Sequence, residues 1–117
     1  MLSLKKVEGL VRNLETYTKY LARLARLSQE EFLADPITQG AAKYYLLASI
    51  ECCLDIANHI MTVRRFRAPK DYADTFQVLG EQGILPEAFA ERLQQMARFR
   101  NLLVHQYAKV DDAQVYQ

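Results

Sequence analysis

The residues whose types and spacing suggest chemistry lie close to the C-terminal end of this chain. Four residues with side chains suited to such chemistry fall within eight positions, namely Arg100, Asn101, His105 and Tyr107. A histidine titrates near neutral pH, so it can take a proton from a ribose 2′-hydroxyl or give one to a leaving oxygen. An arginine can hold a phosphate and stabilise the charge that develops on it. The combination indicates cleavage of an RNA phosphodiester without a metal ion.

Arg100 lies in the middle of an apolar stripe on the predicted last helix. At 100° per residue, the stripe is formed by Leu93, Met96, Ala97, Leu103 and Val104. An arginine in such a place costs free energy unless it is paired or meets a ligand. The pattern therefore predicts either a buried or interfacial salt bridge or a site for phosphate or carboxylate, and the sequence leaves both open.

His105 lies on the flank of the same helix, four residues after Asn101. A lone histidine in a helix is usually structural or exposed, so its presence alone does not indicate catalysis. One histidine also cannot easily act as base and acid in the same step. A symmetric dimer would bring two copies of Arg100 and His105 to one cleft. We therefore expect a homodimer that acts on RNA.

Helices are the elements expected to position these residues. Apolar residues recur every three or four positions, and the period-two alternation of strands is absent. Ser28 with Glu31 forms a capping-box pattern, and Asp35 before Pro36 is typical of a helix start. The sequence predicts an all-α antiparallel helical bundle in a single domain, 1–117. Three long helices are expected over about 4–27, 36–66 and 86–108. One or two short helices are expected beside them, over 71–81 and at a short turn over 29–33.

Composition limits the class of protein. The net charge of +1 gives no overall attraction to nucleic acid, so any such attraction must be local. No long uncharged apolar run predicts a membrane span, and the first residues do not read as a signal peptide. Cys52 and Cys53 are neighbours on a helix, point about 100° apart and are expected to stay reduced. We expect a cytoplasmic protein.

A polar seam follows the apolar second helix at helical spacing. It consists of Glu51, Asp55, Asn58 and Thr62. In one interpretation, the seam is a surface that faces solvent or a second copy. In the other interpretation, Asp55 or Asn58 supports the site by orienting Arg100 or His105 from across the bundle.

A dense basic cluster stands where the second helix is expected to end. Its members are Arg64, Arg65, Arg67 and Lys70. Cations there complement the helix dipole, and they are equally suited to guiding an RNA backbone. The spacing of Cys52, Cys53 and His59 does not match a structural zinc motif, and the chain has no Glu-x-x-His. We therefore expect no metal site and no cofactor.

The segment Arg100–Tyr107 resembles the Arg-x4-His-x-Tyr motif of HepT proteins, a branch of the HEPN superfamily. The resemblance extends in order through the whole chain, including the segments 32–40, 51–60 and 83–86. It implies a HEPN-like helical bundle that forms a homodimer, with a ribonuclease site at the dimer cleft.

The same resemblance implies roles for particular residues and a partner. Arg100 and His105 would be the catalytic pair. The partner would be a minimal nucleotidyltransferase antitoxin of the MntA type, which would transfer AMP to Tyr107 and so silence the toxin. The alternative is a HEPN module without ribonuclease activity that binds nucleotide or serves only as the substrate of the transferase. A weaker alternative is a dimerisation bundle in which Arg100 merely pairs with an acid such as Asp55.

Overall fold

The computed structural model describes residues 4–105 and 115–116, and the described part is built from helices, as the sequence predicts. The helices are α1 (Leu4–Leu24), α2 (Gln29–Ala34), α3 (Pro36–Arg64), α4 (Tyr72–Glu81) and α5 (Glu87–His105). The prediction of three long helices with one or two short ones is therefore confirmed. The end of the predicted last helix, 106–108, lies outside the described residues.

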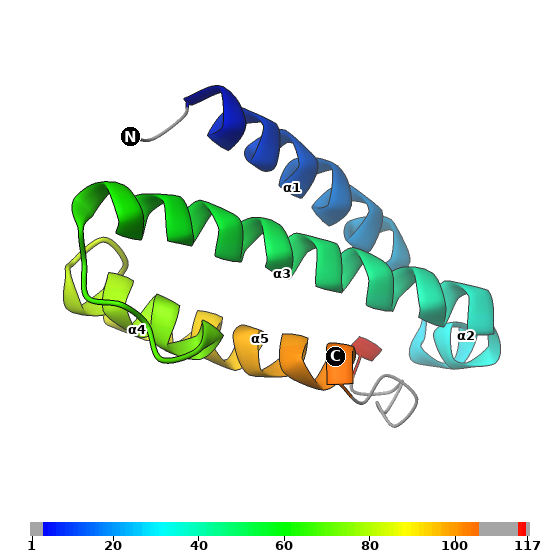
Figure 1. Cartoon of the computed structure of the whole chain (residues 1–117). Coiled ribbons are helices and arrows are strands. Elements are labelled where there is room, and N and C mark those ends of the chain that lie inside the picture. The colour runs from blue at the N-terminus through cyan, green and yellow to red at the C-terminus, as the bar shows by residue number, and fades with distance from the viewer. Residues whose placement is uncertain (1–3, 106–114, 117) are drawn as a thin grey trace.

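The long helix α3 is the centre of the arrangement (Figure 1). On one side it packs against α1, and on the other it faces the pair formed by α4 and α5. The short helix α2 packs beside the N-terminal end of α3. The molecule is elongated, with principal extents of 47 × 27 × 24 Å. This layout places α5, which carries the candidate residues, alongside α3.

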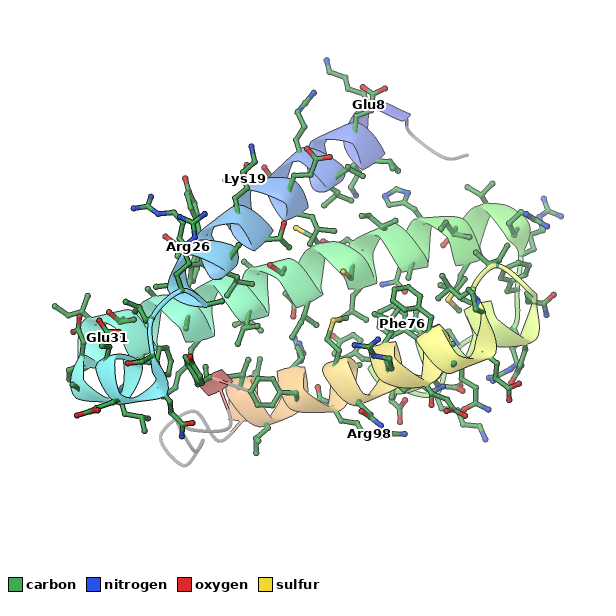
Figure 2. All side chains as sticks on the ribbon, turned by 180° about the vertical axis from the view of Figure 1, so that it is seen from behind. Glu8, Lys19, Arg26, Glu31, Phe76 and Arg98 are labelled. Carbon is green, nitrogen blue, oxygen red and sulfur yellow. The ribbon has the colours of Figure 1, made fainter. Side chains whose placement is uncertain are left out.

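Two groups of buried side chains hold these layers together. The larger lies between α3, α4 and α5 and includes Leu54, Met61, Phe76, Val78 and Ala97, each no more than 6% exposed. Phe76 points from α4 toward α3 (Figure 2). The smaller group joins α2, α3 and α5 through Phe32, Ala42 and Leu103. Burial of these apolar side chains supplies the main driving force for assembling the bundle.

The helix starts follow the local signals in the sequence. Ser28 accepts a hydrogen bond from the Glu31 backbone, and the Glu31 side chain accepts one from the Ser28 backbone, which completes the predicted capping box. Asp35 accepts from the backbone of Ile37 and caps α3 ahead of Pro36.

Two helices end in the same hydrogen-bonding pattern. After α4, Gly83 takes a left-handed φ of 73°, and the N–H of Ile84 donates to the carbonyl of Leu79 at 3.0 Å. After α3, Arg65 takes φ 53°, and the N–H of Phe66 donates to the carbonyl of Met61 at 3.1 Å. The helix therefore ends two residues before its predicted end at about residue 66. The turn at Arg65 brings Phe66 against the buried group, and that packing outweighs the strain of a left-handed arginine.

The helix α3 is the one described helix that is long and apolar enough to cross a membrane by length and composition alone. A central helix of a bundle passes the same test, and α3 packs against other helices on two sides. Part of α3 is nevertheless accessible, since Tyr44 is 58% exposed. The helix is therefore buried only on the sides that face its neighbours.

Candidate functional site

Arg100 occupies the place on α5 that its sequence pattern indicates. The apolar neighbours on its helix, Ala97 and Leu103, are at most 1% exposed, and Leu93 and Met96 pack against the buried group. The Arg100 side chain is only 15% exposed. A charged group in that position needs partners, because burial without them is costly.

Three side chains from three helices hold the guanidinium of Arg100. Its Nε donates to Oε1 of Glu51 on α3 at 2.5 Å. Its Nη1 donates to Oδ1 of Asn101 at 3.2 Å. The ring of Tyr72, the first residue of α4, lies under the guanidinium carbon at 4.5 Å from the ring centroid, a cation–π contact.

These contacts leave most of the hydrogen-bonding capacity of Arg100 unused. A guanidinium carries five N–H donors in one plane, and the described residues take up two of them. The ion pair with Glu51 fixes one edge of the plane, and Tyr72 covers one face. The remaining donors suit the bidentate recognition of an oxyanion such as a phosphate.

An open cavity of about 790 Å³ adjoins this arginine. Its lining comes from α3, the loop before α4, α4 itself and α5, and includes Asn58, Asp71, Tyr72, Arg100, Asn101 and Val104. The structure therefore brings together Arg100, Asn101 and Asn58 from the sequence-predicted set. A ligand in this cavity would contact the arginine, two amide side chains and an aromatic ring at once.

The other member of the predicted catalytic pair, His105, is the last described residue of α5. Its backbone is helical and lies five residues after Arg100, but its side chain lies outside the described part of the structure. Tyr107 also lies outside the described residues. Their roles stay predictions.

Asp55 does not contact Arg100, contrary to one of the roles that the sequence suggested for it. Its side chain is exposed and forms no ion pair or hydrogen bond with another described residue. The other suggested role, orienting His105, stays a prediction because the His105 side chain lies outside the described part. The acid that pairs with Arg100 is Glu51, one turn earlier on α3. Glu51 belongs to the predicted polar seam, but the seam gave no sign of which member faces α5.

The structure separates the predicted basic cluster into three places. Arg64 lies over the ring of Phe66 at 5.5 Å, and Arg65 lies at the turn after α3. Arg67 binds Asp74 through two hydrogen bonds of 2.7 and 2.9 Å and also binds Glu81. Lys70 lines a pocket that also reaches Asn101, and Arg67 lines the same pocket.

The Arg67 contacts change the acidity of their partners. Hydrogen bonds from the Arg67 guanidinium, and then from the Lys70 backbone N–H, lower the pKa of Asp74 to about 2. The Arg67 hydrogen bonds also lower the pKa of Glu81. These shifts mark a clasp between the α3–α4 loop and α4, so Arg67 has little capacity left for RNA.

Within residues 4–105 and 115–116, no group of three or more histidine, cysteine or acidic side chains is arranged to hold a metal ion. Sequence reasoning did not single out Tyr72 or Arg98 as functional. Tyr72 follows the N-cap Asp71, which is a signal for a helix start and not for a contact with Arg100. Arg98 stands outside the apolar stripe and reads as an ordinary surface residue.

The chain is similar in sequence to known proteins of one family. Residues 13–117 match the family model described as "Ribonuclease HepT-like". The "mRNA nuclease HepT" of Shewanella oneidensis is 24% identical over 104 residues, which cover 87% of this chain and 78% of that protein. The "tRNA nuclease HepT" of Aphanizomenon flos-aquae is 26% identical over 102 residues, which cover 86% of this chain and 68% of that protein.

A solved structure has the same arrangement of helices. It is that of the tri-AMPylated Shewanella oneidensis HEPN toxin in complex with MNT antitoxin. The superposition has a TM-score of 0.76 at 24% identity and covers 91% of this chain and 81% of the other. That similarity shows that the two chains share a fold.

Proposed function

The chain belongs to the HepT-like ribonuclease family, and on that premise we propose that it is a metal-independent endoribonuclease toxin that acts in the cytoplasm through Arg100 and His105. The observation that carries the proposal is the half-buried Arg100, which Glu51, Asn101 and Tyr72 orient beside an open cavity. Nucleases of two other organisms with the same family name support the choice of RNA as substrate.

The proposed reaction is an attack by the ribose 2′-oxygen on the adjacent phosphorus. One histidine takes the 2′-hydroxyl proton, the new P–O bond forms, and the 5′-oxygen leaves with a proton from a second histidine. Arg100 donates its unused N–H groups to the phosphate oxygens as negative charge builds on them. The products are a 2′,3′-cyclic phosphate and a 5′-hydroxyl. Two copies of His105 require a homodimer with the cleft between its subunits.

The decisive test is incubation of total cellular RNA with purified protein in the presence of EDTA. Wild type should release discrete fragments, and His105→Ala should release none while it keeps its helical circular dichroism spectrum. Cleavage by His105→Ala would remove that residue from the mechanism, and loss of wild-type cleavage in EDTA would contradict metal independence. No cleavage by folded wild type with unmodified Tyr107 would favour the alternative, a HEPN module that only binds its partner.

We further propose a partner, a nucleotidyltransferase antitoxin of the MntA type that modifies Tyr107 with AMP. Support comes from the HEPN toxin of Shewanella oneidensis, which is AMPylated and bound to an MNT antitoxin in its solved structure. Tyr107 follows His105 by two residues, so an adenylyl group there adds negative charge and bulk close to the proposed site. It would compete with the RNA phosphate for Arg100.

Mass spectrometry of the toxin after co-expression with its transferase tests the modification. A peptide containing Tyr107 should carry added AMP, and Tyr107→Phe should lose that adduct. An adduct that persists on other residues of Tyr107→Phe would contradict the assignment.

A further inference from the structure

A second, smaller pocket adjoins the Arg100 cavity. It has a volume of about 320 Å³ and is bounded by the loop before α4, by α4 and by α5. Lys70 and Arg98 line this second pocket and are absent from the Arg100 cavity, whereas Asp71 and Asn101 line both. The two hollows are therefore neighbours that share a wall.

Most of the charged groups around this pocket are already taken up by one another. Arg67 is bound by Asp74 and Glu81. The carboxylate of Asp74 also accepts the backbone N–H of Lys70 at 2.9 Å, and that of Asp71 caps α4 by accepting the N–H of Asp74 at 2.8 Å. The acidic residues of the pocket thus have their own donors.

Lys70 and Arg98 are the exceptions. Both side chains are exposed, and neither forms an ion pair or a side-chain hydrogen bond within the described residues. The charge of Lys70 does lie within electrostatic range of Asp74, whose oxygens already bind Arg67 and the Lys70 backbone. The pocket therefore presents two cations whose donors remain open to a ligand.

The helical geometry of α5 links these cations to the catalytic arginine. Arg98 and Arg100 point about 160° apart around the helix, and Asn101 lies between them, about 60° from Arg98 and about 100° from Arg100. Figure 2 shows Arg98 on the side of α5 that faces away from α3. Arg100 instead binds Glu51, which belongs to α3. A strand that crosses Asn101 would pass from one arginine to the other.

We propose that Lys70 and Arg98 form a second phosphate subsite, which binds the backbone of the RNA strand whose scissile phosphate lies at Arg100. The inference rests on the proposed ribonuclease function. It favours a polynucleotide over a free anion, because successive phosphates of one strand can occupy adjoining pockets while a single anion occupies one. Lysine and arginine at phosphates add affinity without reading the bases.

Salt-dependent binding of a single-stranded RNA oligonucleotide tests this subsite. His105→Ala protein serves as the background, because it should bind RNA without cutting it. The slope of log K against log salt is negative. Each phosphate contact that is lost reduces its magnitude by about 0.7 for single strands. Lys70→Gln and Arg98→Gln should each reduce the slope by about that amount and weaken binding alike for RNAs of different sequence.

The matched control is Lys19→Gln on α1, which lies on the other side of α3 and also removes one exposed cation (Figure 2). It should leave the slope unchanged. Slopes and affinities equal to those of the background in both Lys70→Gln and Arg98→Gln would overturn the subsite. Inorganic phosphate and unlabelled RNA should also be compared as competitors of the bound RNA at equal phosphate concentration. Equal displacement by the two competitors would overturn the strand interpretation.

The outcomes separate this inference from the proposed function. If wild type cleaves RNA while both variants bind it normally, the subsite fails and the ribonuclease stands. If wild type neither cuts nor binds RNA, the proposed function fails and the subsite falls with it.

Discussion

At the residue scale, three neighbouring side chains hold the guanidinium of Arg100, each through a different kind of interaction. Glu51 compensates its charge, Asn101 accepts one N–H, and Tyr72 restricts the plane of the guanidinium. None of these contacts blocks all the donors that a phosphate needs. The site is therefore an arginine that is positioned before the substrate arrives, which lowers the entropy cost of reaching the transition state.

The contact with Tyr72 predicts a difference between two substitutions. A cation–π contact contributes about 0.5–2 kcal/mol, and about 1.4 kcal/mol corresponds to a tenfold change in rate. Tyr72→Leu should lower kcat/KM for RNA cleavage by roughly tenfold. Tyr72→Phe keeps the ring and should stay close to wild type. An equal loss in Tyr72→Phe would show that the hydroxyl matters and not the ring.

The ion pair with Glu51 predicts an energetic coupling with Arg100. Glu51 is 40% exposed and Arg100 15%, so the pair should contribute less than the ~3–5 kcal/mol seen when a fully buried pair is broken. We expect a coupling of about 1–2 kcal/mol in a double-mutant cycle of Glu51→Gln and Arg100→Gln. Urea unfolding of the four proteins measures it. Strictly additive effects would mean that the contact contributes nothing to stability.

The sequence could locate Arg100 but not its partners. Its helical spacing places it on a face that must be buried, and that conclusion needs only local geometry. The choice of Glu51 over Asp55 depends on the rotation of α3 against α5, because the two acids lie one turn apart on the same seam. Tertiary packing determines that rotation, and no spacing within one helix reports it.

At the element scale, helix boundaries were predictable where a side chain or a glycine makes them. Ser28, Asp35 and Gly83 each act on the backbone within a few residues, so their effect is visible in the sequence. The end of α3 has no such residue. It depends on the burial of Phe66 against residues far along the chain, which explains why the prediction ran two residues too far.

Alanine substitutions at two glycines should have opposite effects on stability, because only one of the two glycines lies where α4 packs on α5. A Cβ at Gly80 would lie 2.9 Å from the Cβ of the buried Ala90, closer than real Cβ atoms approach. Gly80→Ala should therefore destabilise the fold by about 1–3 kcal/mol. Gly40 in α3 has nothing within 4 Å of its Cβ position, so Gly40→Ala should stabilise by about 0.5–1 kcal/mol. Thermal unfolding compares them, and a Gly80→Ala protein as stable as Gly40→Ala would contradict the close approach.

The clasp between Arg67 and α4 predicts a dependence of stability on pH. The folded-state pKa of Asp74, about 2, lies below that of an unfolded aspartate, and the pKa of Glu81 is also lowered. A carboxylate whose pKa is lower in the folded protein than in the unfolded chain stabilises the fold at a pH above its unfolded-state pKa. This contribution is lost as the pH falls through the folded-state pKa. Most of it should come from Asp74, which is 11% exposed, because Glu81 is 43% exposed and screened by solvent.

Arg67→Gln should therefore be less stable than wild type near neutral pH, with a gap that narrows between about pH 4.5 and pH 2. Urea unfolding across that range measures the gap. Lys19→Gln, which removes a cation with no carboxylate partner among the described residues, should show no such narrowing. A gap for Arg67→Gln that stays constant with pH would show that the clasp acts through packing alone.

At the scale of the whole molecule, α3 is more apolar than its neighbours in one chain require. Only 33% of its most apolar 18-residue window is buried within the chain, and Ile37 and Tyr44 are 83% and 58% exposed. The radius of gyration of 15.4 Å exceeds the roughly 13 Å typical of a compact chain of this size. An elongated chain with an incompletely covered apolar helix is a suitable half of a larger assembly.

The proposed homodimer leads to a prediction about mixed subunits. The mass in sedimentation should be twice the 13.5 kDa of one chain. If one cleft needs His105 from both subunits, a subunit of His105→Ala inactivates any wild-type chain with which it pairs. After exchange with a ninefold excess of His105→Ala, random pairing should leave about a tenth of the wild-type activity. Serum albumin at the same concentration should leave it unchanged. Full activity in the mixture, with exchange verified by mass, would mean that each chain carries a complete site. The shared cleft would then be wrong, and a single His105 would have to serve as both base and acid.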